Sequence, residues 1–123
     1  MNEDNPKKFN KRNLPKGVKI AIRASQDKKG EEIMVLDLSG ISSFTDIFII
    51  MHGNSSRQNL AIYESIEQEL KAAKIRPLSK EGVKNAEWIL LDYGSFIIHI
   101  FSKEAREYYM LEKLWTDAQK LTY

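Results

Sequence analysis

Four short runs of apolar residues constrain the fold of this chain more than any other feature. They span residues 33–38, 44–51, 88–92 and 96–101, and they are rich in side chains that favour extended backbone. Because the apolar residues are continuous rather than alternating, each run predicts a strand that is covered on both faces. The last two runs are joined by Tyr93-Gly94-Ser95, a sequence typical of a β-hairpin.

Amphipathic segments between these runs supply helices to cover the sheet. Residues 16–28 and 55–74 place apolar side chains at helical spacing, and Ser55 and Gln58 have the spacing of a capping box. Residues 102–121 predict a third helix, whose apolar positions are Tyr108, Leu111, Trp115 and Ala118. The expected element order is α-β-β-α-β-β-α, which describes a single α/β domain with a mixed sheet packed by helices.

Length and charge divide the chain into two parts. Its 123 residues suffice for one domain, which we place at residues 16–123, after a flexible basic extension over residues 1–15. Residues 1–16 carry five basic and two acidic side chains, whereas the remainder carries 14 basic and 15 acidic ones. A nearly neutral domain is a poor candidate for binding a phosphate backbone with its body. The extension is expected to be solvated, with contact to nucleic acid as the alternative.

Composition also bears on the compartment. The absence of cysteine excludes disulfides and thiolate chemistry. The longest apolar runs, such as Ile47 to Met51, are too short to span a membrane. The N-terminus lacks the apolar core of a signal peptide, and Glu3 and Asp4 argue against a transit peptide. We therefore expect a cytoplasmic protein without membrane contact.

The pattern of polar residues predicts neither a metal site nor a catalytic nucleophile. His52 and His99 are 47 positions apart, each alone in an apolar run, and zinc requires three or four ligands at fixed geometry. None of the serines lies in a Gly-x-Ser-x-Gly motif. No cofactor is expected either.

Residues 52–57, His-Gly-Asn-Ser-Ser-Arg, form the strongest candidate for phosphate binding. They predict a strand, a turn and a helix N-terminus, where backbone N–H groups can hold an anion. Nucleotidyltransferases begin their active site with a similar turn, but they also need two or three carboxylates on neighbouring strands to hold metal. Asp37, Asp46 and Asp92 occur singly. We therefore expect a turn and a helix cap, not an enzyme.

Strand alternation gives residues 88–101 a candidate binding face. Trp88, Leu90 and Asp92 fall on one side of the first strand, and the residues between them fall on the other. Both sides carry aromatic residues, so we expect one side to face the core and the other to meet a partner. Interface anchors are enriched in tryptophan, and we therefore predict Trp88 as the anchor, with Leu90 and Asp92 beside it.

Further candidates for the same face come from other segments of the chain. They are Asp46, His99, Tyr108 and Tyr109. The alternative, that Trp88 and Trp115 both belong to the core, stays open from the pattern alone.

Six motifs in a fixed order show what the chain is similar to. They are Thr45-Asp46-Ile47-Phe48-Ile49-Ile50, Gly53-Asn54-Ser55-Ser56-Arg57-Gln58, Glu81-Gly82 with Glu87-Trp88-Ile89-Leu90-Leu91-Asp92-Tyr93-Gly94, Ile98-His99-Ile100-Phe101, Arg106-Glu107-Tyr108-Tyr109 and Leu111-Glu112-Lys113-Leu114-Trp115. In order and spacing they resemble the ribosomal silencing factor family, also called the Iojap-like proteins. The resemblance covers about residues 18 to 117.

The resemblance implies a nucleotidyltransferase-like α/β fold without the catalytic carboxylates. It also implies a translational repressor that binds the large ribosomal subunit through its fourteenth protein (uL14), at the face used for subunit joining. Occupying that face blocks the small subunit and lowers translation when nutrients are scarce. Free members of the family tend to form homodimers.

Two points stay open beside this resemblance. The family motifs do not reach the basic extension, for which contact with ribosomal RNA is an alternative to simple solvation. The second candidate function is a nucleotide-binding or nucleotidyl-transferring enzyme on the same fold.

Overall fold

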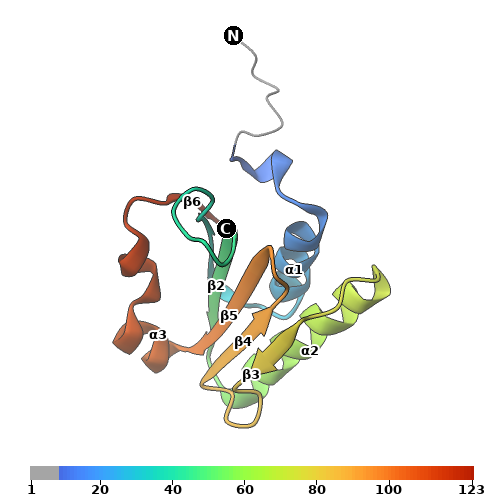
Figure 1. The fold of residues 1–123 in the computed structure, drawn as a ribbon. Helices are drawn as coiled ribbons and strands as arrows, with labels where there is room; N and C mark the ends of the chain where they lie inside the picture. The colour runs from blue at the N-terminus through green and yellow to red at the C-terminus, as the bar shows by residue number, and fades with distance from the viewer. Residues whose placement is uncertain (1–8) are drawn as a thin grey trace.

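The computed structural model describes residues 9–123, which form a six-stranded mixed sheet with helices on both faces (Figure 1). In chain order the elements are η1 (Lys11–Asn13), α1 (Lys16–Asp27), β1 (Glu31–Asp37), β2 (Ile47–Gly53), α2 (Ser56–Ala72), β3 (Ser79–Glu81), β4 (Trp88–Asp92), β5 (Phe96–Ser102), α3 (Lys103–Tyr109), η2 (Leu111–Trp115) and β6 (Gln119–Thr122). The strands lie in the order β3-β4-β5-β2-β1-β6. The central neighbours β2 and β5 run parallel, and the other pairs run antiparallel.

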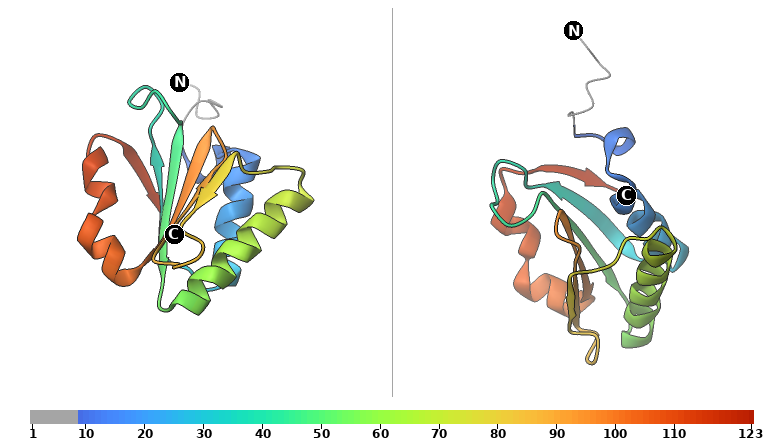
Figure 2. Two further views of the ribbon diagram at one scale, coloured as in Figure 1. Left: turned by 60° about the horizontal axis from the view of Figure 1, so that its bottom comes forward. Right: turned by 45° about the vertical axis from the view of Figure 1, so that its right-hand side comes forward.

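The sheet separates two apolar clusters of different size. Helices α1 and α2 cover one face, and α3 with η2 lies over the other, as the two views in Figure 2 show. The α1/α2 side holds the larger cluster, and the α3 side holds a smaller one around Leu36, Ile50 and Phe101. Strand β2 is buried at every position, which confirms the prediction of a strand covered on both faces. Within residues 9–123, no helix is both long and apolar enough to cross a membrane.

The junction between α1 and α2 depends on Gln58. Ser55 caps α2 by accepting a hydrogen bond from the backbone N–H of Gln58 at 3.0 Å, which is the first half of the predicted capping box. The reciprocal hydrogen bond goes to the residue before the cap. The Gln58 side chain accepts from the backbone N–H of Asn54 at 2.6 Å. It also donates to the carbonyl oxygens of Lys28 and Lys29 at 3.2 and 3.0 Å. One side chain thus joins the start of α2 to the end of α1.

The prediction of a single helix over residues 102–121 is wrong beyond its first two turns. Helix α3 ends at Tyr109, and Met110 then takes a left-handed backbone conformation with φ 45°. A helix of twenty residues would be about 30 Å long, whereas the seven-residue strands below it span about 23 Å. The break lets Leu111 and Trp115 pack on the sheet, and it returns the chain to β1, where β6 forms the edge.

The other strands also differ from their predicted bounds. Strand β2 is Ile47–Gly53 rather than residues 44–51, so Phe44 lies in the loop before it. Strand β1 begins at Glu31 instead of residue 33. The edge strand β3 was not predicted, because its polar and exposed sequence, Ser-Lys-Glu, carries no apolar signal.

Residues 9–15 fold against the domain, although the sequence places them in a flexible extension. Phe9 packs on the larger apolar cluster, and Leu14 is buried within it. Residues 11–13 form the short helix η1, which Asn10 caps through its side chain. The remaining part of the predicted extension, residues 1–8, lies outside the described residues.

The role of Gln58 gives a prediction for stability. We expect Gln58→Ala to lower the free energy of unfolding by about 1 kcal/mol, because the hydrogen bonds from Gln58 to the carbonyls of Lys28 and Lys29 are lost. Urea denaturation followed by tryptophan fluorescence measures this. Gln68→Ala is the matched control, since Gln68 is exposed on the same helix and should change stability by less than about 0.5 kcal/mol. Equal losses in the two variants would contradict the role of Gln58.

Candidate functional site

The predicted binding residues of β4 lie on the sheet face that α3 covers in part. Trp88, Leu90 and Asp92 are half-buried on this face, whereas Ile89 and Leu91 are buried on the α1/α2 side. This confirms the predicted alternation. We call this surface the aromatic face. Its ring-bearing residues are Phe44, Phe48, Trp88, His99, Phe101, Tyr108, Tyr109 and Trp115.

Trp88 is held in one orientation by three neighbours. Its indole Nε1–H donates to Nδ1 of His99 at 3.1 Å. Its ring lies 4.9 Å, centroid to centroid, from the ring of Phe101 on β5 and 4.9 Å from that of Tyr109 on α3. Trp88 is half-buried: part of its ring packs on the smaller apolar cluster, and the rest is accessible to solvent. It therefore does not belong wholly to the core, and its predicted role as an anchor stays a prediction.

His99 is the buried support beneath Trp88. It is 3% exposed, and burial lowers its pKa to about 3, so the ring is neutral at physiological pH. Because Nδ1 accepts the hydrogen bond from Trp88, Nε2 carries the ring hydrogen, and it has no acceptor within residues 9–123. The Phe48 ring lies 4.4 Å away at 67°. His99 is therefore a positioning residue for Trp88 and offers no surface of its own.

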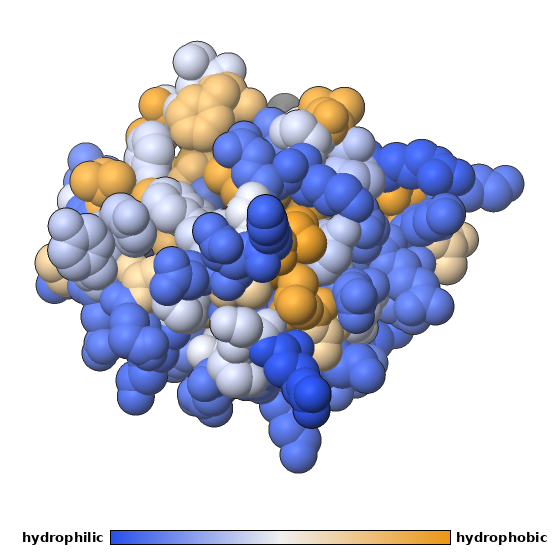
Figure 3. All heavy atoms as spheres, turned by 90° about the horizontal axis from the view of Figure 1, so that it is seen from below, coloured by the Kyte–Doolittle hydropathy of each residue, from blue (hydrophilic) through white to orange (hydrophobic). Residues whose placement is uncertain are grey.

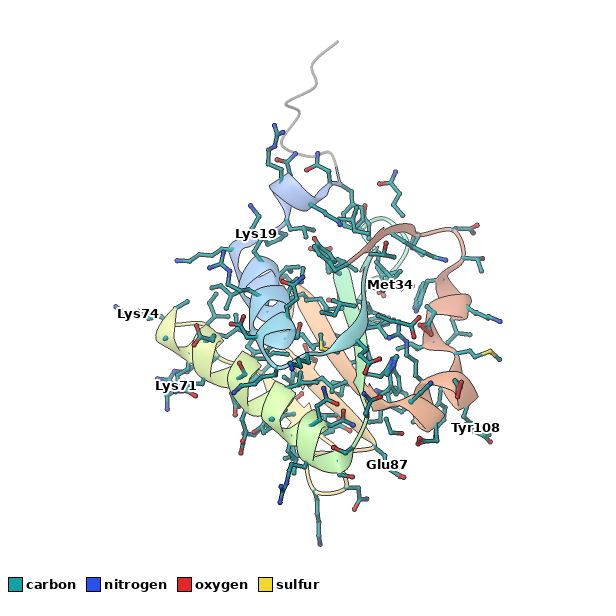
Figure 4. The ribbon with its side chains drawn as sticks, turned by 180° about the vertical axis from the view of Figure 1, so that it is seen from behind. Lys19, Met34, Lys71, Lys74, Glu87 and Tyr108 are labelled. Atoms are coloured by element: carbon teal, nitrogen blue, oxygen red, sulfur yellow. The ribbon has the colours of Figure 1, made fainter. Side chains whose placement is uncertain are left out.

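Tyr108 and Tyr109 form the exposed rim of the aromatic face. Tyr109 is 51% exposed beside Trp88, and Tyr108 is 78% exposed with its ring edge-on to Tyr109 at 5.0 Å. Figure 4 shows Tyr108 projecting outward from α3, away from the sheet. The structure thus brings Trp88, His99 and both tyrosines together, although they come from three separate elements.

Arg106 fixes the position of α3, and with it the rim. Its guanidinium pairs with the carboxylate of Glu112 at 3.1 Å and lies 3.1 Å from Nδ1 of His52. It also donates to the carbonyl oxygen of Glu31 on β1 at 3.4 Å. Burial, followed by the charge of Arg106, lowers the pKa of His52, while Glu32 and Glu31 oppose this shift. A neutral His52 accepts from Arg106, so the contact ties α3 to β2.

Asp92 and Asp46 lie at the far end of the aromatic face, away from Trp88. Asp92 is four residues along β4, about 13 Å from Trp88. Its carboxylate accepts from the backbone N–H of Gly94 at 2.8 Å and so shapes the hairpin turn. Asp46 is exposed before β2, where its backbone N–H donates to the carbonyl of Ser95 at 3.1 Å. The two residues therefore lie beside the same turn.

The aromatic face also contains a second group of residues, which were not predicted from the sequence. Phe44 is 58% exposed, and its ring contacts the half-buried Trp115 at 6.4 Å. Trp115 also packs edge-on to Phe48 at 6.0 Å, and Leu114 beside it is 71% exposed. The sequence placed Phe44 in a strand and Trp115 among the apolar positions of a helix, with a core role for Trp115 left open. These residues could have been identified from the aromatic side chains in the segments that flank the predicted strands and helices.

A family model, described as ribosomal silencing factor during starvation, matches residues 11–123. The chain belongs to the ribosomal silencing factor family. This confirms the resemblance seen in the sequence motifs. The match begins at the residues of η1, so it includes part of the segment that the sequence placed in the extension.

Individual relatives agree with the family assignment. The ribosomal silencing factor of Bacillus subtilis is 45% identical over 101 residues, covering 82% of this chain and 86% of that protein. A mouse protein named mitochondrial assembly of ribosomal large subunit protein 1 is 32% identical over 102 residues, covering 80% of this chain and 45% of that protein. A crystal structure from Chromobacterium violaceum gives a TM-score of 0.79 at 36% identity, covering 81% and 83% of the two chains. The single α/β domain with a mixed sheet is thereby confirmed.

The three aspartates considered as possible metal ligands in this silencing-factor family member lie apart from one another. Strand alternation puts Asp37 on the α1/α2 side of β1, where its side chain accepts from Ser39, whereas Asp92 is on the aromatic face. Asp46 precedes β2 in a loop. Among residues 9–123, no group of three or more His, Asp or Glu side chains is arranged to hold a metal ion. These three aspartates therefore do not share a metal site.

The turn at residues 53–57 is occupied by its own capping contacts. Ser55 accepts from the start of α2, and the Gln58 side chain takes the N–H of Asn54. Asn54 also donates its side-chain amide to Glu31. Figure 3 views the molecule from the end where this turn lies, and hydrophilic side chains cover most of that surface. The residues act as a turn and a cap, as the sequence predicted.

The burial of His99 predicts a pH dependence of stability. A histidine whose pKa falls on folding stabilises the protein above its unfolded pKa of about 6.5, and this contribution is lost as the pH falls toward the folded value. Between pH 6.5 and 5, a single proton of this kind costs about 2 kcal/mol. We expect the free energy of unfolding to fall accordingly, as measured by urea denaturation at several pH values.

His99→Asn isolates the contribution of His99 from that of His52. The Asn side chain retains an acceptor near the position of Nδ1 but does not titrate. We expect this variant to lose about 2 kcal/mol less than the wild type on acidification from pH 6.5 to 5. Identical acid sensitivity in the two proteins would contradict the buried neutral histidine.

Proposed function

We propose that this chain is a translational repressor that binds the large ribosomal subunit through its fourteenth protein and sterically blocks joining of the small subunit. Family membership supports the ribosomal part, since relatives are named ribosomal silencing factors and the mouse relative is named for assembly of the large ribosomal subunit. The observation that carries the proposal is the aromatic face. There the half-buried Trp88 lies beside the exposed Tyr108 and Tyr109.

The aromatic face has the properties of a protein-binding surface. Large exposed aromatic residues surround a half-buried tryptophan, which is the composition that interface hot spots favour. The hydrogen bond to His99 fixes the Trp88 ring before binding, so little side-chain entropy remains to be lost. Asp46 and Asp92, at the other end of the face, would pair with basic groups on the partner and set its orientation.

Repression by this mechanism requires only that the chain occupies its site on the large subunit. It involves no chemical step. A bound domain of 14.2 kDa on the joining face excludes the small subunit by its volume. One copy for each large subunit is then sufficient. The same proposal includes lowered translation under nutrient limitation, a cytoplasmic location and a homodimer of the free chain.

The second candidate, a nucleotidyltransferase-like enzyme, is less well supported. Its chemistry requires carboxylates that converge on a divalent metal. Asp37 and Asp92 lie on opposite faces of the sheet, and the turn at residues 53–57 is occupied by capping contacts. A distant nucleotidyltransferase-like origin of the fold is compatible with these features, and we keep it as part of the proposal.

The proposed mechanism predicts an effect on separated ribosomal subunits. Adding the chain to an equimolar mixture should lower the fraction of joined ribosomes in sucrose gradients, without nucleotide and with magnesium held constant. The effect should saturate near one copy for each large subunit, and the chain should sediment with large but not with small subunits. An unchanged gradient profile at saturating protein would contradict the proposal.

A further inference from the structure

Basic residues are segregated in this chain, although its net charge is only +2. Residues 9–26 contain five basic and no acidic side chains, and residues 70–80 contain four basic and no acidic ones. The near-neutral total, from which the sequence suggested a domain body unsuited to phosphate binding, conceals this separation. What matters for binding is where the charges lie in the fold.

Antiparallel packing of α1 on α2 brings the two basic segments together. Ser65 Oγ on α2 donates to the carbonyl oxygen of Ala24 on α1 at 3.3 Å. Ten residues further along the chain, Ile75 reaches the first turn of α1, where a Cβ built on Gly17 would lie 3.4 Å from Ile75 Cδ1. The N-terminal turns of α1 and the C-terminal end of α2 are therefore neighbours.

The cations at this end form what we call the basic surface. Lys80 is not part of it, because its ammonium pairs with Glu67 at 3.0 Å. Figure 4 shows Lys19, Lys71 and Lys74 projecting into solvent at this end of the two helices. The members of the basic surface, all exposed, are Lys16, Lys19, Lys71, Lys74 and Arg76 at this end, with Arg23 one turn further along α1.

We infer that the basic surface binds the phosphate backbone of RNA. Lysine ammonium groups act as mobile point charges, which suits contacts to phosphates that do not depend on base sequence. Lys16, Lys19 and Arg23 follow one another at i, i+3 and i+7, so they line one side of α1 and present charge along its length. The choice of RNA over DNA rests on the proposed function, because a ribosomal subunit presents RNA to a bound protein.

The position of the basic surface allows it to act together with the aromatic face. The two helices that carry it cover the side of the sheet opposite to α3 (Figure 2). A contact to phosphates on one side therefore leaves the other side open to a protein. Such a chain would bridge a ribosomal protein and a neighbouring segment of RNA.

An anionic membrane is a poorer match for the basic surface. A helix that lies in a membrane interface inserts an apolar side next to its cations. In α1 the apolar side is not available for insertion into a membrane, because Val18, Ala21 and Ile22 are buried against the sheet. Charge alone would attract phosphates without inserting into lipid.

The experiment measures binding of the full chain to a fluorescein-labelled RNA hairpin by fluorescence anisotropy, from about 50 to 200 mM salt. A triple variant, Lys16→Gln, Lys19→Gln and Lys71→Gln, removes three charges from the basic surface. We expect its affinity at the lowest salt to fall roughly tenfold or more, and the salt slope to decrease by about 2. The matched control, Lys28→Gln, Lys84→Gln and Lys113→Gln, removes three exposed charges elsewhere and should stay within about twofold of the wild type.

Three results would overturn this inference. They are no binding of the wild type to the hairpin, equal losses in the two triple variants, and tighter binding to vesicles of anionic phospholipid than to RNA. Trp88→Ala separates the inference from the proposed function. It should bind the hairpin like the wild type while losing affinity for large subunits. RNA binding without any subunit binding by the wild type would refute the proposed function alone.

Discussion

Strands β2 and β5 run parallel at the centre of the sheet, and the rest of the fold depends on how the chain makes this pairing. Parallel neighbours cannot be joined by a tight turn, so the chain crosses over through α2 and the β3–β4 hairpin before it returns as β5. The crossover buries one face of the sheet. The register then sets Ile50 of β2 and Leu90 of β4 on either side of His99, in the middle of the other face.

That central position explains how a histidine that is not exposed can order the proposed binding surface. Surrounded by apolar strands, His99 stays neutral, and its free nitrogen lone pair accepts the indole N–H of Trp88. Arg106 plays a comparable part for α3 through its contacts with His52, Glu112 and the backbone of Glu31. Buried polar contacts thus place the exposed rings. The partner would meet a surface that is already ordered, which reduces the entropy lost on binding.

The sequence predicted the features that follow from local patterns. Continuous apolar runs gave the central strands, and the Ser55 and Gln58 spacing gave the start of α2, because both signals are local. The long C-terminal helix was mispredicted, since the spacing of Leu111 and Trp115 fits a helix but also fits chain that packs on a sheet after a break at Met110. The edge strand β6 depends on pairing with β1, which is distant in sequence.

The candidate site also combines features that local patterns predict with features that depend on contacts between distant segments. The side of β4 that Trp88 occupies could be predicted from alternation, whereas its hydrogen bond to His99 depends on the register between strands. The position of Phe44 opposite Trp115 depends on a loop whose path no pattern revealed. Charge segregation on α1 and α2 was concealed because a net charge sums over faces that the fold separates.

The most direct test of the aromatic face is the affinity of Tyr108→Ala for isolated large ribosomal subunits. Tyr108 is 78% exposed, so its truncation should leave the melting temperature unchanged. Gln68→Ala is the control, because Gln68 is exposed on α2, which covers the opposite side of the sheet. If the face is the docking surface, Tyr108→Ala and Trp88→Ala should each weaken binding, with Trp88→Ala losing about 2 kcal/mol, or roughly thirtyfold. Wild-type affinity in both variants, each verified to be folded, would show that the partner docks elsewhere.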